Sequence, residues 1–329
     1  MTAEAPAVTD DRLLKAGLVK RLLTRPEFGS IIGAIAVFVF FSVITENFFT
    51  VDAISAYTNP AATLGIMAVA VALLMIGGEF DLSSGALIGG LGITMALLIQ
   101  NAGAPVWLAM LLSLALAVGV GIFNGVMVIK TGLPSFIVTL GTFFIVQGAG
   151  LGFTRLISGQ TTIYLSEYLE GSDWTRILFA STPFAGIRIP VYYWIAIAAL
   201  ATFLLVRSRY GNWIFSVGGD AAAARAVGVP VNRVKIALFV NVSVSAWLVA
   251  MFNTFRFQSA QIGTGVGLEF EFIIAAVIGG CLLTGGYGSA IGAAIGALIF
   301  EMVRQGLAFA RWEADWFKLF LGLMLLGAA

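Results

Sequence analysis

The chain has 329 residues, of which 60% are hydrophobic and only 11% are charged, and its formal net charge is +1. A soluble globular domain carries about 25% charged residues. The composition therefore excludes an ordinary soluble domain and predicts an all-α polytopic membrane protein surrounded by a lipid bilayer. The nearly balanced charge gives no reason to expect a nucleic-acid partner.

The predicted elements begin with a polar, basic N-terminal segment over residues 1–27, followed by a transmembrane domain over 28–329. A helix crosses a hydrocarbon core of about 30 Å with roughly 20 apolar residues. By this criterion the chain contains about ten expected spans: 28–46, 60–78, 83–100, 106–129, 134–153, 189–207, 235–255, 268–284, 288–304 and 313–329.

Loop charges predict the orientation of these spans. Lys and Arg gather in the N-terminal segment and in 208–235, whereas the loop 46–59 contains neither. Because short cytoplasmic loops are enriched in basic residues, we expect a cytoplasmic N-terminus and a cytoplasmic 208–235 segment. The long segment 154–188 is then on the outer face. Its residues 166–179 mix aromatic, aliphatic and charged side chains, as expected for an interfacial helix.

Two polar turns, 77–85 and 279–289, interrupt the apolar runs, and both begin with Ile-Gly-Gly. Polar breaks at corresponding places in two halves of a transporter mark its pathway and an internal repeat. The alternative is that each turn only joins two helices. In the first turn, Asp81 and Ser83 are candidate pathway residues, and Asp81 is also expected to organise the turn by accepting backbone N–H bonds.

Polar residues at depth in the spans are of two kinds. Most of the ionisable ones, which include Glu269, Glu271, Glu301 and Arg304, are expected to reach an interface. The uncharged ones fit a pathway for a neutral polyhydroxylated solute, or they hydrogen-bond one helix to another. These uncharged pathway candidates are Asn124, Thr139, Gln147, Asn241, Ser245 and Asn253.

The segment 208–235 carries a short predicted helix. Asp220 suits the N-cap, residues 221–227 are helix formers on balance, Gly228 suits the position after the helix and Pro230 prevents its continuation. A helix of about two turns is marginal alone in water, so we expect it to dock on another surface. The alternative is a solvated loop.

The sequence lacks two features that nucleotide-binding proteins and many enzymes use, a phosphate-binding loop and histidine. No stretch fits Gly-x-x-x-x-Gly-Lys-Ser/Thr, so we expect no nucleotide site in this chain. The sequence has no histidine, and its one cysteine, Cys281, is in an apolar run. We therefore expect no catalytic, cofactor or metal site, and no enzyme activity.

Five blocks together resemble the ribose/xylose/arabinose-type permeases of bacterial ATP-binding-cassette (ABC) importers. Residues 77–83 are similar to that family's Gly-Gly-x-Asp-Leu-Ser signature, with one extra residue before Asp81. Residues 119–125 and 133–141 resemble the next two blocks. Residues 218–229 are similar to the coupling segment, with Asp220 where Asn is common, and 275–289 resemble the C-terminal block.

The resemblance implies the membrane subunit of a type II ABC importer for a sugar or related small polar solute, in the bacterial inner membrane. It implies three protein partners: a second copy of the chain, a cytoplasmic ATPase that binds ATP and Mg, and a periplasmic or lipid-anchored solute-binding protein. The coupling contacts would be made by Gly219, Asp220, Ala221, Ala224, Arg225 and Gly228. The alternative is a secondary carrier or facilitator for a neutral polar solute that works without ATP.

Overall fold

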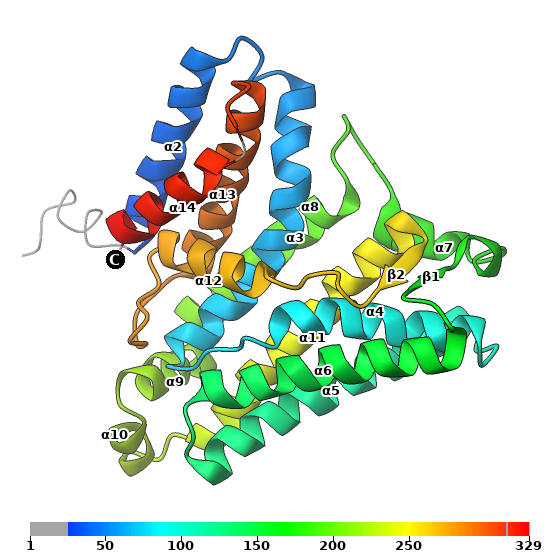
Figure 1. Cartoon of the computed structure of the whole chain (residues 1–329). Coiled ribbons are helices and arrows are strands. Elements are labelled where there is room, and N and C mark those ends of the chain that lie inside the picture. The colour runs from blue at the N-terminus through cyan, green and yellow to red at the C-terminus, as the bar shows by residue number, and fades with distance from the viewer. Residues whose placement is uncertain (1–25, 314, 329) are drawn as a thin grey trace, which may run out of the picture.

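The computed structural model describes residues 26–313 and 315–328 (Figure 1). The predicted N-terminal segment 1–27 lies outside the described residues except for its last two. The longer helices are α2 (Pro26–Ile44), α3 (Val51–Ile76), α4 (Ser84–Gln100), α5 (Val106–Thr131), α6 (Ser135–Ser158), α8 (Ile189–Arg207), α9 (Arg209–Gly219), α11 (Val231–Phe257), α12 (Leu268–Ile278), α13 (Ala290–Phe309) and α14 (Asp315–Ala328).

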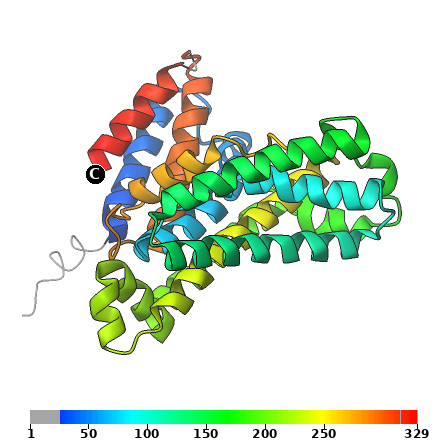
Figure 2. The ribbon, with the colours of Figure 1, turned by 60° about the horizontal axis from the view of Figure 1, so that its bottom comes forward.

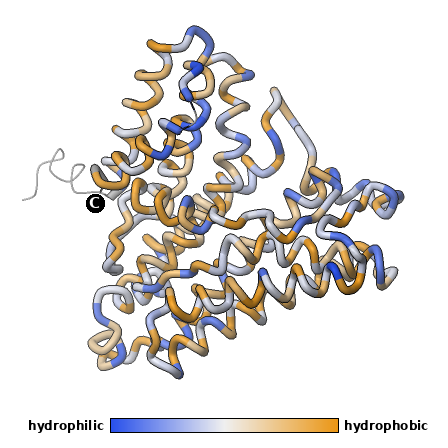
Figure 3. Tube along the Cα trace, in the orientation of Figure 1, coloured by the Kyte–Doolittle hydropathy of each residue, from blue (hydrophilic) through white to orange (hydrophobic). Residues whose placement is uncertain are grey.

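The predicted all-α polytopic class is confirmed. Among the described residues, seven helices are long and apolar enough to cross a membrane: α2, α3, α5, α6, α8, α11 and α13. Three further helices, α4, α12 and α14, occupy expected spans but are shorter than the others. The apolar character of α5 and α6 is visible along most of their length (Figure 3).

Two expected spans differ most, each at one end, from the helices in the structure. The helix expected at 60–78 begins at Val51, where the Thr50 hydroxyl accepts a bond from the Ala53 amide, and Pro60 lies inside it. The span expected at 268–284 ends as a helix at Ile278. The cause is local, because Gly280 has φ +89°, a conformation that terminates helices and favours glycine.

The core of the bundle is formed by α3 and α13, which pack against each other and are the most buried of the spanning helices. Helix α3 also contacts α8, α11 and α12, while α11 packs along α4 and α5. Helices α2 and α6 have the fewest buried residues of these spanning helices. The result is a group containing α2, α3, α13 and α14 beside a second group of α4, α5, α6 and α11 (Figure 1).

One end of the molecule carries a small antiparallel sheet. Strand β1 (Thr162–Tyr164) pairs with β2 (Ser259–Gln261), so the segment after α6 is joined to the end of α11. The prediction of one continuous interfacial helix over 166–179 is wrong. This stretch instead forms three short pieces: η2 (Ser166–Tyr168), α7 (Asp173–Thr175) and η3 (Arg176–Ala180).

The opposite end carries α9 and α10 (Ala221–Ala226), which project from the bundle (Figure 2). In the chain, helix α10 directly precedes α11, and strand β2 directly follows α11. The 27 residues of α11, at 1.5 Å each, therefore separate the two ends by about 40 Å. We call the end with α9 and α10 the α10 end, and the end with β1 and β2 the hairpin end.

Candidate functional site

The turn between α3 and α4 is anchored to α6 by its backbone. The Phe80 amide donates to the Ser135 hydroxyl at 2.9 Å, and the Leu82 amide donates to the Thr139 hydroxyl at 3.0 Å. Ser135 and Thr139 lie one turn apart near the start of α6. The amides of Phe80 and Leu82 make no hydrogen bond within a helix, and these two hydroxyls accept from them instead. The bonds hold the turn in one conformation at the α10 end.

Within the turn, Asp81 and Ser83 form the centre of a buried network. One Asp81 carboxylate oxygen accepts from the Ser83 amide at 2.8 Å and from its hydroxyl at 2.5 Å. The Asn124 side-chain amide donates to the Ser83 hydroxyl at 3.0 Å, and Thr142 donates to the Asn124 carbonyl oxygen at 2.6 Å. These side chains are all buried. The expectation that Asp81 organises the turn by accepting a backbone N–H is confirmed.

The two glycine turns meet in space. The backbone amide of Gly286 donates to the Ile76 carbonyl at 2.9 Å, which connects the turn after α12 to the end of α3. Gly218, near the end of α9, lies between them. A Cβ on Gly218 would overlap the Ile76 carbonyl oxygen and approach the Gly286 nitrogen to 2.7 Å. A side chain at residue 218 is therefore incompatible with this contact.

The first parts of the two turns have the same backbone geometry. Gly78 and Gly280 both have positive φ, +83° and +89°. In residues 77–79 and 279–281 the three successive amides donate to carbonyls four, three and five residues earlier. The shared Ile-Gly-Gly pattern thus produces the same helix end twice, which is the local basis of the suggested repeat.

A salt bridge links the first turn to α11. Lys235 near the start of α11 pairs with Glu79, and both side chains are mostly buried. The pair lies in a polar cavity of about 380 Å³ at the α10 end, which Arg225 and Asn232 also line. Sequence reasoning did not identify this pair, because no sequence spacing connects an acid after α3 with a lysine in α11.

Helix α10 has the predicted cap and length. One Asp220 carboxylate oxygen accepts from the amides of Ala222 at 2.8 Å and Ala223 at 3.0 Å, as an N-cap requires. Gly228 has φ +87°, as expected for the residue that follows a helix. Ala224 is buried against the protein, whereas Val227 is 80% exposed. The helix is therefore docked on one side and open on the other.

The predicted coupling residues thus lie on one short projection. Gly219, Asp220 and Arg225 are exposed, Ala221 is half-buried and Ala224 is buried. The Arg225 guanidinium donates to the Asn232 side-chain oxygen at 3.4 Å. The projection is continuous with Gly218, so it is attached where the two glycine turns meet.

The predicted pathway residues separate into two groups. Asp81, Ser83, Asn124 and Thr139 hydrogen-bond within the protein at the α10 end, so their polar groups hold the first turn in place. The remaining four are half-buried and make no side-chain hydrogen bond to another described residue: Gln147, Asn241, Ser245 and Asn253.

The ionisable residues of α12 and α13 are more buried than expected. Glu269 and Glu301 are almost fully buried. Arg304 binds Glu301 and Glu271 at 2.8 Å each, and the Glu269 carboxylate accepts from the Gly267 amide at 2.9 Å. The expectation that most of these groups reach an interface is wrong for Glu269 and Glu301, because protein surrounds α12 and α13 there.

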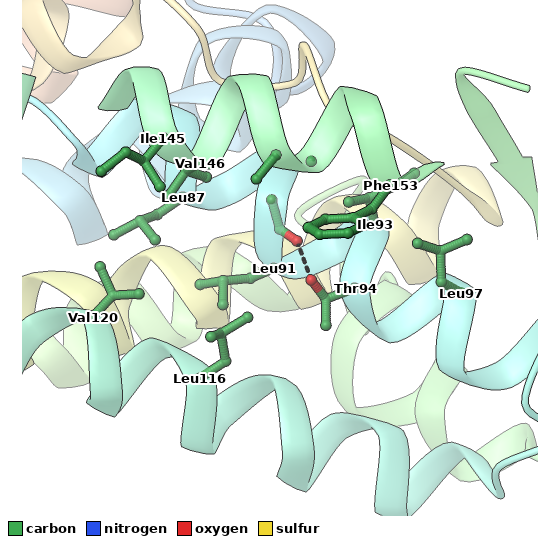
Figure 4. A pocket seen from close by; sticks show the side chains of 13 residues that line it. Leu87, Leu91, Ile93, Thr94, Leu97, Leu116, Val120, Ile145, Val146 and Phe153 are labelled. Carbon is green, nitrogen blue, oxygen red and sulfur yellow. Dashed lines mark hydrogen bonds between the residues drawn. The ribbon is translucent and has the colours of Figure 1, made fainter. Parts of the chain in front are cut away.

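One face of α4 borders an apolar cavity of about 320 Å³, shared with α5 and α6 (Figure 4). Leu91, Leu116 and Phe153 are among its lining side chains. The Thr94 hydroxyl, the one side-chain hydroxyl in the lining, donates to the Gly90 carbonyl at 2.7 Å. This cavity therefore offers no free side-chain hydroxyl to a polar solute.

Comparison with known proteins gives a family match over residues 53–329, to the family described as the permease component of branched-chain amino acid transport systems. The autoinducer 2 import system permease protein LsrD of Klebsiella pneumoniae is 30% identical over 83% of this chain and 81% of its own length. The probable ABC transporter permease protein YphD of Escherichia coli is 30% identical over 85% of this chain and 81% of its own length. No solved structure matches the chain.

Proposed function

The chain belongs to the family of permease components of branched-chain amino acid transport systems, and on that premise we propose that it carries a sugar or a related small polar solute into the cell. The predicted resemblance to permeases of ABC importers is confirmed by the similarity to LsrD and YphD. The chain is accordingly a multi-pass permease subunit of the inner membrane, like these relatives.

The proposed architecture is that of a type II importer with ten membrane crossings and a cytoplasmic N-terminus. The observation that supports the count is the position of α12. Its 11 residues cover about 16 Å, roughly half of a hydrocarbon core of about 30 Å. The non-helical segment 258–267, which contains β2 and the turns after it and leads from the hairpin end to α12, would supply the other half of that crossing.

Helix α10 is proposed as the coupling helix that docks in a groove of a cytoplasmic ATPase. The single observation that carries this proposal is the exposed, capped projection attached at Gly218. Val227 presents an aliphatic side chain to the surroundings, and Arg225 adds a positive charge. A partner groove would cover Val227 and stabilise a helix too short to be stable alone.

The remaining partners follow from this assignment. The ATPase would bind ATP and Mg, so the permease itself would need no cofactor. A second copy of the chain would form the other half of a homodimeric pathway. A periplasmic or lipid-anchored solute-binding protein would deliver the solute to the hairpin end, where segment 154–188 would face the periplasm.

ATP would act through differential binding to two states of the complex. Closure of two ATPases would move α10. Because α10 is continuous with Gly218, that movement would reach both glycine turns. The first turn is bonded to α6 and paired with α11. A displacement at the α10 end would therefore change how α6 and α11 pack along the pathway.

The test is a gentle-detergent pull-down of the tagged chain from its native membranes, with mass spectrometry of the retained proteins. Recovery of an ATPase with a Gly-x-x-x-x-Gly-Lys-Ser/Thr loop supports the proposal, and a co-purified solute-binding protein would provide the material for ligand screening. Recovery of the chain alone after mild cross-linking, together with gradient-driven uptake in liposomes that contain only this chain, would favour the ATP-independent carrier instead.

A further inference from the structure

A second face of α4 is lined by glycines that allow a non-helical segment to lie against it. A Cβ on Gly85 would overlap the Gly265 carbonyl oxygen at 2.5 Å, and a Cβ on Gly89 would overlap backbone oxygens of Ile262 and Thr264. The segment between β2 and α12 therefore runs directly along α4. Non-helical backbone at membrane depth is tolerated where it is buried in protein or lines a water-filled cavity.

A cavity of about 320 Å³ opens beside this segment, between α4, the end of α11 and the two strands. We call it the hairpin cavity. None of the residues that line it is ionisable. Six of them carry an uncharged polar side chain: Thr162, Asn253, Thr254, Ser259, Gln261 and Thr264. No side chain of these six makes a hydrogen bond to another described residue.

Thr254 shows how unusual this lining is for a membrane helix. Other threonines in the helices, such as Thr94, Thr154 and Thr202, donate their hydroxyl to the carbonyl four residues earlier. Thr254 is 3% exposed, yet its hydroxyl makes no such bond. Thr254 lines the cavity, so this hydroxyl is available to water or to a solute there.

We propose that the hairpin cavity binds a neutral, polyhydroxylated solute of monosaccharide size as it enters the pathway. This inference rests on the proposed function and adds the site and the chemical features that select the solute. Hydroxyl groups of a sugar can both donate to and accept from the amides of Asn253 and Gln261 and the hydroxyl of Thr254. The cavity volume is at the lower end of the roughly 300–1,000 Å³ of small-molecule sites.

The same lining disfavours other solutes. A zwitterionic amino acid or an anion would lose hydration without meeting an opposite charge. An apolar solute would leave the polar side chains unpaired, which is the most effective way for a site to reject a ligand. The apolar cavity on the other face of α4 has a similar volume but lacks free side-chain hydroxyls, so it serves as the internal comparison.

The experiment measures solute protection against thiol labelling. The native cysteine, Cys281, is 2% exposed, so an introduced cysteine provides the accessible thiol. Asn253→Cys and Thr264→Cys place it in the cavity, and Tyr164→Cys places the control on β1 at a residue that is 66% exposed and does not line the cavity. A small polar maleimide is applied to the purified complex with D-ribose, D-glucose, L-leucine or D-gluconate at equal osmolality.

We expect D-ribose or D-glucose to slow labelling at residues 253 and 264 at least threefold, with no change at residue 164. Adding Thr254→Val should raise the sugar concentration that gives half-protection by about threefold to tenfold, the effect of one lost hydrogen bond. Adding Thr94→Val, on the apolar face, should leave that concentration unchanged.

The inference is overturned if neither sugar protects, or if L-leucine or D-gluconate protects as well as the sugars do. The same preparations show whether an ATPase co-purifies. If neither sugar slows labelling but the ATPase co-purifies, only the assignment of the cavity is contradicted. If neither sugar slows labelling and no ATPase co-purifies, the proposed function is contradicted as well.

Discussion

The backbone amide of Gly286 donates a hydrogen bond of 2.9 Å to the carbonyl oxygen of Ile76. This bond joins the turn after α12 to the end of α3, and Gly218 lies against both. The base of the α10 projection is therefore in direct backbone contact with the two polar turns. A movement of α10 therefore reaches both turns through a contact of backbone atoms, beside the side-chain contacts that Ala224 and Arg225 make.

Gly218→Ala should destabilise the protein, because its Cβ would overlap the Ile76 carbonyl oxygen. Overpacking of a close contact costs about 1–3 kcal/mol, which thermal unfolding in detergent would show as a lower Tm. Gly219→Ala is the matched control, because a Cβ there has no atom within 4 Å. Equal Tm values for the two variants would contradict the close contact.

Breaking the salt bridge between Glu79 and Lys235 should lower both Tm and ATP-dependent uptake. Either Glu79→Gln or Lys235→Met leaves one mostly buried charge unpaired, and such a loss typically costs about 3–5 kcal/mol. The exchanged double variant, Glu79→Lys with Lys235→Glu, should recover part of the lost Tm. A double variant as unstable as the sum of the two single ones would argue against pairing.

Asp81→Ala should reduce stability without changing which solute is transported. The substitution removes the acceptor of two hydrogen bonds from Ser83 and leaves buried donors unpaired, at about 1–3 kcal/mol for each buried donor. Asp81→Asn retains an oxygen acceptor and should recover much of the loss. The measurements are Tm and the uptake of competing solutes. An altered solute preference at unchanged Tm would show instead that Asp81 contacts the solute.

Val227→Asp and Arg225→Glu should weaken association with the ATPase while leaving Tm unchanged. Both side chains are exposed on the projection, and the one hydrogen bond that Arg225 makes among the described residues, to Asn232, is long at 3.4 Å. Retention of the ATPase in a pull-down is the measurement. Asn212→Asp, an exposed change on α9, is the control and should retain it. ATP-dependent uptake at the wild-type rate in both α10 variants would rule out α10 as the coupling helix.

Residues at the two ends of the molecule should react with a membrane-impermeant thiol reagent from opposite sides of the membrane. Tyr164→Cys on β1 should be labelled in intact cells after removal of the outer membrane. Ser216→Cys on α9 should be labelled in inside-out vesicles. The buried Cys281 should contribute little background. Labelling of both variants from the same side would contradict the proposed orientation.

Much of the fold could be predicted because its signals are local. Each of the ten expected spans contains a helix in the structure, since the length and apolarity of a run are read along the chain alone. The cap at Asp220 was also predictable, because capping depends on a few neighbouring residues. The end of α12 before Gly280 was not, since the apolar run was expected to continue as a helix to residue 284. The mixed stretch 166–179 was predicted wrongly as one helix, whereas the structure divides it into three short pieces.

The sequence by itself determined that lipid is the solvent, the order of the helices, the short docking helix and the family to which the chain belongs. Only the tertiary structure decided that Gly218 lies between the two glycine turns, that Glu79 pairs with Lys235 and that Thr254 faces a polar cavity. These relationships join residues far apart in the chain. They depend on how the helices pack, and a pattern that repeats within one helix or one turn carries no information about which other segment it will contact.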